Sequence, residues 1–327
     1  MRVLITGASG FIGAYLVEEG LRRGYEVWVA VRSTSDLSRL PKGNIHILVD
    51  LPFDKVNQLT ERLATIPKDW DYVLHNAGAT KVVDKEDFLR INALYTKNFT
   101  EALVAAGRSP KKFLLMSSLS SYGRSDEKTF RPICISDPQH PESLYGQSKL
   151  AAERYVALAP FPYVILHPTG VYGPGDKDYA LALQKVRKGI GFAVGIKSQK
   201  LTFIYVKDLA RIAFLALENN KALNKRYLVA DGDTYTDRTF THLMQQAVGR
   251  RFLISLRIPL PLVRLACLCS EQFGRLRNQP MTLNSDKYLI LRQRNWVCDT
   301  TLLRDELGFV PEYPLEKGLA EIVTHSQ

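Results

Sequence analysis

A tyrosine and a lysine one helical turn apart could together carry out acid–base chemistry. Tyr145 and Lys149 stand in the segment YGQSKLAAERY, whose pattern predicts a helix. The i, i+4 spacing places both side chains on one face of that helix, so the ammonium group can lie near the phenol. A free phenol has a pKa of about 10, and a neighbouring positive charge lowers such a pKa by roughly 1–3 units. The pair therefore predicts a proton donor and acceptor for a carbonyl or hydroxyl group.

A serine cluster supplies a third polar group. Residues 117–121 read SSLSS and directly follow the apolar run 112–116, which is predicted to be a buried strand. In parallel sheets, ligands bind at the carboxyl ends of the strands, so a hydroxyl group at this point is expected to face a ligand. Taken by itself, a serine cluster more often marks a turn.

Three glycines predict a phosphate-binding turn. Residues 6–13, TGASGFIG, join the predicted strand 2–5 to a helical pattern, with Gly7, Gly10 and Gly13 at a Gly-x-x-Gly-x-x-Gly spacing. Glycines permit a tight turn, approach of a pyrophosphate to the backbone, and close packing of helix on strand. The free N–H groups of a helix N-terminus favour an anion. A bare tight turn is the alternative. The glycine-rich segment 189–195 has a different spacing and is predicted to be a loop.

The end of the second predicted strand bears on the choice of dinucleotide. A carboxylate at this point would bind the ribose hydroxyls of NAD, whereas a basic residue suits the 2′-phosphate of NADP. The strand ends in Arg32 and Ser33, and no carboxylate appears before Asp36. This pattern predicts NADP, with NAD second; a solvated arginine at a strand end is the alternative. Asp50, which closes the third strand before Leu51, is predicted to lie against the adenine.

Strand-like and helix-like patterns alternate through the first half of the chain. This rhythm predicts an α/β fold, a Rossmann-type doubly wound parallel sheet with a smaller, mostly helical C-terminal substrate lobe. The sheet domain is predicted to comprise residues 1–172 with 203–230 returning to it, and the substrate lobe 173–202 and 231–327. The predicted strands of the first half are 2–5, 26–31, 45–49, 72–74, 112–116 and 163–166.

These motifs together resemble the extended short-chain dehydrogenase/reductase family, which includes nucleotide-sugar epimerases, dihydroflavonol reductases and hydroxysteroid dehydrogenases. The resemblance covers nearly the whole chain. It rests on the glycine turn, Ser118, Tyr145 and Lys149, and on further segments in family order. Those segments are His75-Asn76-Ala77-Gly78, Ile91-Asn92-Ala93, residues 167–175 (HPTGVYGPG), residues 203–208 (FIYVKD) and residues 305–311 (DELGFVP).

The resemblance implies roles for individual residues. Tyr145 would be the acid/base, Lys149 would tune it and bind the nicotinamide ribose, Ser118 would hold the substrate oxygen, and Asn92 would complete the catalytic set. His167 stands where relatives often have arginine. Two subunits would pair through the helices that carry Asn92 and Tyr145. The remaining cofactor contacts would be Gly7, Ser9, Gly10, Phe11, Ile12, Gly13, Ala77, Gly78, Pro168, Thr169 and Val171. The substrate contacts would be Thr80, Ser120, Tyr122 and Tyr172.

Departures from the family pattern bear on the reaction. Dehydratases of the family place an Asp-Glu pair after the active-site Ser or Thr, where this chain has Leu119 and Ser120. Many sugar-nucleotide enzymes carry an arginine where Leu201 stands. With Arg32, these features favour an NADP-dependent carbonyl reductase or alcohol dehydrogenase acting on an apolar small molecule. The alternatives are a nucleotide-sugar 4-epimerase that uses NAD without net turnover, and a non-catalytic nucleotide-binding scaffold.

Composition excludes several other classes. The 327 residues are 46% hydrophobic and 24% charged, which excludes a disordered or collagen-like chain. The net charge of +11 favours anionic ligands, but no recognition helix, zinc site or aromatic RNA-binding motif supports nucleic-acid binding. Four cysteines without a Cys-x-x-Cys pair predict free thiols and no metal site. A strand starting at residue 2 leaves no room for a signal peptide, so a cytoplasmic enzyme is expected.

One apolar segment near the C-terminus allows two interpretations. Residues 258–268 carry Arg264 in their middle and are shorter than the roughly 20 apolar residues that span a bilayer. They are predicted to be a core helix of the second lobe, and membrane contact is not expected. An amphipathic helix that touches a membrane or a lipid-like substrate is the alternative.

Overall fold

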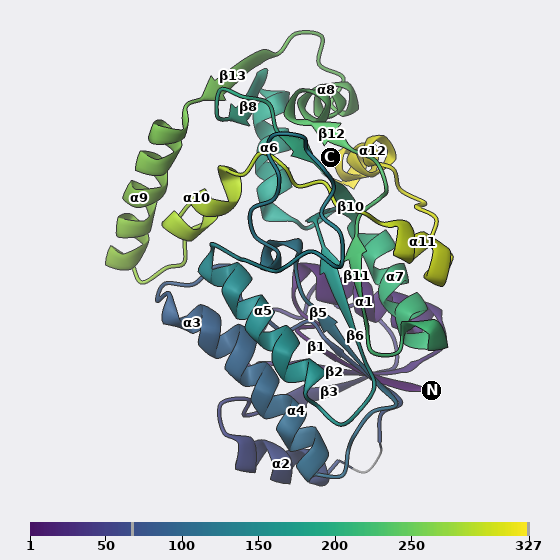
Figure 1. The fold of residues 1–327 in the computed structure, drawn as a ribbon. Coiled ribbons are helices and arrows are strands. Elements are labelled where there is room, and N and C mark those ends of the chain that lie inside the picture. Colours follow the sequence, from purple (N-terminus) through teal and green to yellow (C-terminus); the bar gives the residue numbers. More distant parts are fainter. Residues whose placement is uncertain (67–68, 326–327) are drawn as a thin grey trace.

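The protein is built around a seven-stranded parallel sheet (Figure 1). The structure, a computed structural model, describes residues 1–66 and 69–325. The sheet has the strand order β11-β6-β5-β4-β1-β2-β3, which confirms the Rossmann-type α/β fold. Its strands are β1 (Arg2–Thr6), β2 (Glu26–Val31), β3 (Ile45–Val49), β4 (Tyr72–His75), β5 (Lys112–Met116), β6 (Tyr163–Pro168) and β11 (Lys225–Val229).

Helices cover both faces of this sheet because its strands are apolar on both sides. Successive residues of β1 enter different cores: Val3 and Ile5 pack with Phe214 on one face, and Leu4 packs with Phe99 on the other. The first face carries α1 (Phe11–Arg22) and α7 (Val206–Glu218), followed by the short η3 (Asn220–Ala222). The second carries α2 (Val56–Ala64), α4 (Tyr95–Ala105) and α5 (Leu144–Ala157). Two short turns, α3 (Glu86–Phe88) and the π-helix η1 (Leu89–Leu94), lead into α4.

The remaining segments gather at one end of the sheet, at the top of Figure 1, around an aromatic cluster. Tyr172, Phe203 and Tyr205 form its centre. Three two-stranded ribbons lie here: β7 (Gly170–Tyr172) with β10 (Phe203–Tyr205), β9 (Lys200–Leu201) with β12 (Tyr235–Thr236), and β8 (Ile190–Val194) with β13 (Ile254–Ile258). The helices are α6 (Lys177–Arg187), α8 (Asp237–Ala247) and α12 (Leu315–His325). Helix α11 (Thr301–Leu307) packs instead beside α7 and β11 on the first face of the sheet.

Strand β8 corrects a prediction, because the glycine-rich segment 189–195 is not a loop. Ile190, Phe192 and Val194 alternate with small residues and pair in parallel with β13. A Cβ atom on Gly191 would lie 2.7 Å from Thr241 Cγ2, so the glycine lets the strand pack closely on α8. Small residues in the strand therefore reflect close packing here, not a break in structure.

Two helices form an arm at the left of Figure 1. The arm consists of α9 (Leu260–Leu276) and α10 (Ser285–Leu291), which contact each other. Pro259 and Pro261 fix the start of α9, where a proline removes no helical hydrogen bond. Within residues 1–66 and 69–325, no helix is long and apolar enough to cross a membrane.

Candidate active site

The structure brings Ser118 and Tyr145 together. Ser118 is the second residue after the end of β5. It caps the short helix η2 (Leu119–Ser121) and accepts a hydrogen bond from Ser120 N at 3.2 Å. Tyr145 is the second residue of α5, whose N-cap Ser143 accepts from Gly146 N at 3.1 Å. The Ser118 hydroxyl lies near the Tyr145 phenol and acts to lower its pKa. The neighbouring Ser117 is buried and donates to Glu153 instead, so Ser118 is the serine available to a substrate oxygen.

The electrostatics of Tyr145 differ from the prediction. Burial raises the pKa of Tyr145, and the nearby Ser118 hydroxyl opposes that shift. Lys149 is buried too, which lowers its own pKa to about 8, with Glu153 acting in the opposite direction. Its Nζ donates to Met116 O at 2.9 Å. The expectation that Lys149 lowers the pKa of Tyr145 is therefore wrong for this structure, because desolvation dominates at both groups.

Asn92 positions the neighbouring backbone. Its amide accepts from Ala79 N at 2.7 Å and donates to Ala79 O at 3.0 Å and to Ser148 Oγ at 2.9 Å. These contacts hold the side chain within the protein, and its predicted place in the catalytic set stays a prediction. A Cβ atom on Gly78 would lie 2.9 Å from Asn92 Oδ1 and 3.1 Å from Lys149 Nζ. Asn92 thus keeps the loop after β4 beside Lys149.

The glycine turn has the geometry of a phosphate cradle. Gly7 has a φ of 68°, and a Cβ atom there would lie 2.8 Å from Ala77 Cα. A Cβ atom on Gly13 would lie 2.1 Å from Gly7 O, so helix and turn touch through backbone alone. Helix α1 starts at Phe11 with no acidic residue in its first turn and no side-chain cap at Gly10. The first N–H groups of α1, among them that of Ile12, are placed to bind an anion. Ser9 lies just before them.

A buried polar chain fixes the loop that carries Ala77. Ala77 N donates to Thr6 Oγ1 at 3.1 Å, Thr6 Oγ1 pairs with His75 Nδ1 at 2.8 Å, and His75 Nε2 pairs with Thr96 Oγ1 at 3.0 Å. Burial, reinforced by Lys149, lowers the pKa of His75 to about 3, so this ring is neutral. His75 matched the family segment in the sequence, but its supporting role depends on residues distant in the chain.

Arg32 and Asp50 lie at the neighbouring ends of β2 and β3. Arg32 is exposed, and among residues 1–66 and 69–325 its side chain makes no hydrogen bond or ion pair. Asp50 accepts from Ser33 N at 2.8 Å, and this bond lowers the pKa of Asp50. Leu51 is buried. The Asp50 carboxylate thus stabilises the turn that follows Arg32. The predicted contact of Asp50 with adenine stays a prediction.

The segment after β6 is also held from within. Thr169 N donates to Val229 O at 3.0 Å and Thr169 Oγ1 to Thr202 O at 2.8 Å. Pro168 ends β6 and Val171 lies in the short strand β7, which pairs with β10. These residues form a rigid edge beside the ends of the central strands, and their contact with a nicotinamide stays a prediction.

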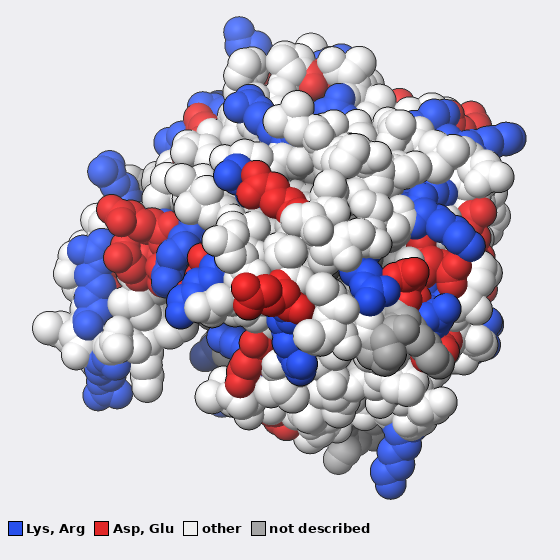
Figure 2. Space-filling model, turned by 90° about the horizontal axis from the view of Figure 1, so that it is seen from below, with Lys and Arg blue, Asp and Glu red and all other residues white. Residues whose placement is uncertain are grey.

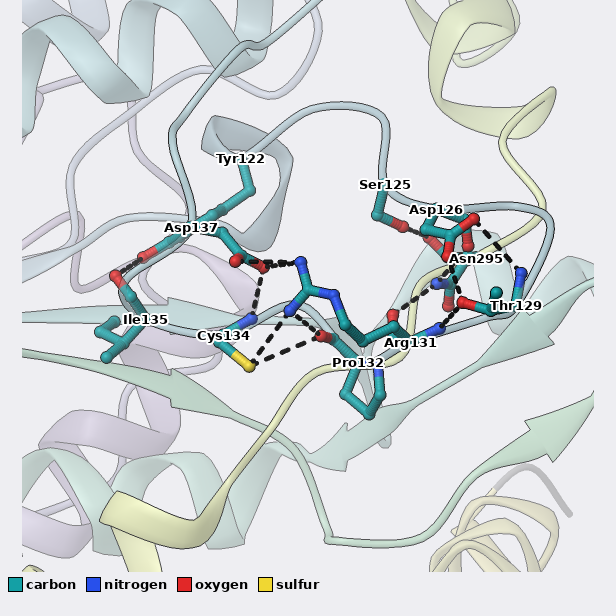
Figure 3. Close-up of polar contacts among 10 residues, drawn as sticks. All are labelled: Tyr122, Ser125, Asp126, Thr129, Arg131, Pro132, Cys134, Ile135, Asp137 and Asn295. Atoms are coloured by element: carbon teal, nitrogen blue, oxygen red, sulfur yellow. Dashed lines mark hydrogen bonds and ion pairs between the residues drawn. The ribbon is translucent and has the colours of Figure 1, made fainter.

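Two of the four predicted substrate contacts are wrong. Tyr172 is fully buried in the aromatic cluster, with its ring centroid 5.3 Å from that of Tyr205. Tyr122 is buried as well, and its hydroxyl donates to Ile135 O at 3.2 Å, which holds the 123–140 loop (Figure 3). Apolar packing and loop anchoring therefore account for both rings. Thr80 and Ser120 keep exposed surface, and their contact with substrate stays a prediction.

Beneath the site, Glu153 is a buried carboxylate that no sequence motif indicates. It lies one turn beyond Lys149 on α5, accepts from Gln139 Nε2 at 2.8 Å, and stands 3.1 Å from His167 Nε2. His167 and these hydrogen bonds outweigh burial and lower the pKa of Glu153 to about 2. Glu153 and His167 are both buried and lie side by side at the position where relatives often have arginine.

A second residue that the sequence did not reveal is Asp286 in α10. Its buried carboxylate accepts from Leu144 N at 2.5 Å and from Tyr145 N at 3.2 Å. Further contacts join the arm region to the sheet domain: Lys85 with Ser285 and Glu271, and Arg292 with Glu142. The backbone of the reactive tyrosine is therefore held by a residue more than 140 positions away.

We expect Asp286→Ala to lower kcat about tenfold, because it removes both acceptors at the start of α5, and to cost roughly 1 kcal/mol of stability, as loss of a helix cap does. Asp286→Asn, which keeps one acceptor, should restore most of kcat with KM little changed. Steady-state kinetics on the best substrate and denaturant unfolding measure both effects. Thr236→Ala, which removes the cap that accepts from Thr239 N on α8, is the control. An equal fall in kcat there would contradict a role specific to Tyr145.

No arrangement of three or more His, Cys, Asp or Glu side chains suited to a metal ion occurs within the part of the chain that the structure describes. Cys134, Cys267, Cys269 and Cys298 are free thiols. The polar groups gathered at the strand ends are thus a phenol, a hydroxyl and an ammonium group beside a glycine turn. This arrangement is typical of one class of protein, the enzymes that bind a nucleotide cofactor at the strand ends of a Rossmann-type sheet.

Comparisons with known proteins identify the family. The NAD dependent epimerase/dehydratase family matches residues 3–230, and the chain belongs to this family of NAD(P)-dependent enzymes. Two relatives differ in reaction. A UDP-glucose 4-epimerase of Vibrio cholerae is 27% identical, covering 98% of this chain and 93% of its own. A 3-beta-hydroxysteroid dehydrogenase of Mycolicibacterium neoaurum is 29% identical, covering 99% and 91%.

The fold agrees with solved structures. A UDP-glucose 4-epimerase of Thermotoga maritima, determined with UDP-glucose, superposes with a TM-score of 0.78 at 22% identity, covering 100% of this chain and 98% of its own. The shared architecture includes the central sheet and the segments above it. At this identity the likeness concerns the fold.

Proposed function

We propose that the protein is an NADP-dependent oxidoreductase that reduces a carbonyl group, or oxidises a secondary alcohol, on an apolar small molecule. The observation that carries the proposal is the pair of Ser118 and Tyr145 beside Lys149 and Gly78. A dinucleotide fits the glycine turn, because a Cβ atom on Gly7 or Gly13 would collide with backbone. When bound, the cofactor supplies or accepts the hydride.

The side chains of this site manage the proton and the substrate oxygen. Ser118 can hold a carbonyl oxygen through a hydrogen bond, and Tyr145 can donate its phenolic proton to the same oxygen as negative charge develops there. The raised pKa of Tyr145 keeps the phenol protonated at neutral pH, the form that a reductase requires. Lys149, held on Met116 O, provides positive charge next to the site. In the oxidative direction the proton moves the opposite way.

The residue at position 201 of the second lobe supports an apolar substrate. Leu201, at the position where sugar-nucleotide enzymes often have arginine, packs in the aromatic cluster and offers no charge to a diphosphate. The relative from Mycolicibacterium neoaurum is a 3-beta-hydroxysteroid dehydrogenase, an enzyme for an apolar substrate. A panel of apolar ketones and aldehydes with NADPH, followed at the absorbance of the reduced cofactor, tests the proposal.

We expect Arg32→Ala to weaken NADPH binding about 10- to 100-fold, because a charged hydrogen bond to phosphate contributes about 1.5–3 kcal/mol. NADH, which lacks the 2′-phosphate, should bind the variant as it binds the wild type. The cofactor-induced shift in melting temperature and the Kd from titration measure both. Arg62→Ala removes an exposed arginine on α2 and should change neither NADPH binding nor NADH binding. Preferential binding of NADH by the wild type would contradict the NADP assignment.

The Vibrio cholerae relative keeps a second function in consideration, a nucleotide-sugar 4-epimerase that uses NAD without net turnover. The same Tyr145 and Ser118 would serve the oxidation and re-reduction of one sugar carbon: Tyr145 would take the proton of the hydroxyl oxygen and later return it, and NAD would accept the hydride of that carbon and give it back. Incubation with UDP-glucose and UDP-galactose distinguishes the two functions. Interconversion of these sugars without consumption of NADPH would replace the reductase with the epimerase.

A further inference from the structure

The outer face of helix α9 is apolar and exposed. Val263, Cys267 and Gly274 face the protein, whereas Leu262, Leu265 and Leu276 are 57%, 58% and 86% exposed. The positions of these leucines, together with those of the less exposed Leu268 (42%) and Phe273 (46%), follow one stripe of the helix. The prediction of a core helix is therefore wrong for this face. Exposed leucines occur singly on most proteins, but a continuous stripe indicates a contact surface.

The apolar surface continues beyond α9 onto the ribbon that precedes it. In the parallel pairing of β8 with β13, Phe192 stands opposite Leu256. Both side chains are exposed, and so are Ile254 and Phe252. We call the exposed apolar residues of α9 and of this ribbon the arm surface. They are Phe192, Phe252, Ile254, Leu256, Leu262, Leu265, Leu268, Phe273 and Leu276.

The charge around the arm surface is positive. Residues 250–277 contain six arginines and a single acidic residue, Glu271, which gives a net charge of +5. Glu271 is engaged by Lys85 and Arg275, so its charge is already neutralised. Arg251 and Arg264 are exposed beside the apolar side chains. In Figure 2, Lys and Arg side chains lie at the left margin, next to both uncharged and acidic surface.

We propose that the arm surface docks onto a bilayer that contains anionic phospholipids. A helix with one apolar exposed face and flanking arginines lies in the plane of a membrane interface and does not cross it. Each arginine near an anionic leaflet adds attraction that salt screens. A second copy of the chain is a poorer occupant, because two arm surfaces would bring like positive charges together at one interface, even though Arg257 is paired with Asp237. The proposal does not depend on the proposed function.

Docking would place the reactive site at the membrane. Glu271 of α9 accepts from Ser285 N at 2.8 Å, and the adjacent Asp286 holds the backbone of Tyr145. These hydrogen bonds join α9 to α10, and α10 to the start of α5. An apolar substrate dissolved in the bilayer would meet the protein beside this site.

Flotation of the purified full-length chain with vesicles, without cofactor or substrate, tests the proposal. Vesicles of phosphatidylcholine with phosphatidylglycerol should carry the protein, and vesicles of phosphatidylcholine alone should carry at least about tenfold less, since both apolar burial and charge contribute. The triple change L262S/L265S/L276S should reduce flotation about tenfold or more. So should the double change R251E/R264E. Added salt should weaken binding to the anionic vesicles.

Matched controls separate the arm from general surface properties. Leu158→Ser changes an equally exposed leucine, 82% accessible, at the end of α5, and Arg62→Glu reverses an exposed charge on α2. Both should float like the wild type. All these side chains are exposed, so the unliganded melting temperature should stay close to that of the wild type in every variant, which checks folding.

Three results would overturn the proposal. These are no flotation with either vesicle, flotation that the arm substitutions leave unchanged, and a concentration-dependent dimer, seen by analytical ultracentrifugation, that L262S/L265S/L276S dissociates. The last result would assign the arm surface to a second copy of the chain. None of them bears on the reductase activity, which is measured separately with soluble ketones.

Discussion

Tyr145→Phe is expected to lower kcat by about 10²- to 10⁴-fold, the contribution of one positioned general acid. The phenol hydroxyl is the group that can give a proton to the substrate oxygen, and the Ser118 hydroxyl lies near it. Phenylalanine keeps the ring and its edge contact with Phe88, whose centroid lies 6.0 Å away, so the fold should persist. The change in melting temperature with NADPH should therefore match that of the wild type while the rate falls.

Tyr155→Phe provides the matched control, because Tyr155 lies on the same helix but away from Ser118. Its kcat should stay within about twofold of the wild type, as expected for a surface substitution. A Tyr145→Phe enzyme with unchanged kcat would contradict the assigned chemistry. It would favour a nucleotide-binding scaffold whose biological role needs no proton transfer.

The sheet could be predicted because local signals and burial agree. The runs at β2, β3 and β5 are mostly apolar, with Val or Ile in β2 and β3 and Phe and Leu in β5, and their boundaries match the structure at both ends. Strand β8 could not be predicted in this way, because its glycine and alanine resemble a loop. Only the contact between Gly191 and Thr241, about 50 residues apart, shows why small residues are required.

The site also combines residues that belong to short sequence motifs with residues that only the folded chain brings together. Tyr145, Lys149 and the glycine turn have short fixed spacings, so their types and positions could be predicted. Asp286 and Glu153 belong to no short motif, and their roles depend on contacts made by the folded chain. The error at Tyr172 has the same origin. Tyr172 stands in the segment 167–175, which resembles the family pattern, but packing against Tyr205 buries its ring.

Gly13→Ala is expected to abolish detectable cofactor binding, a loss of at least about 100-fold in affinity. The new methyl group would lie 2.1 Å from Gly7 O and 2.7 Å from Ala8 Cα, and neither is a flexible side-chain end. Helix α1 must therefore move away from the turn, which misplaces the N–H groups meant for the pyrophosphate. Packing an extra methyl group against backbone should also cost about 1–3 kcal/mol of stability. Titration with NADPH and denaturant unfolding measure the two losses.

Gly24→Ala separates the loss of binding from a general loss of stability. Gly24 has a φ of 77°, so alanine is strained there, but nothing lies within 4 Å of the new Cβ atom. This variant should lose about 1 kcal/mol of stability, the cost of a left-handed non-glycine residue, and bind NADPH as the wild type does. If Gly13→Ala bound NADPH normally, the turn would not be the pyrophosphate site, and the dinucleotide would have to be sought elsewhere along the strand ends. Equal weakening in both variants would instead attribute the effect to destabilisation of α1 as a whole.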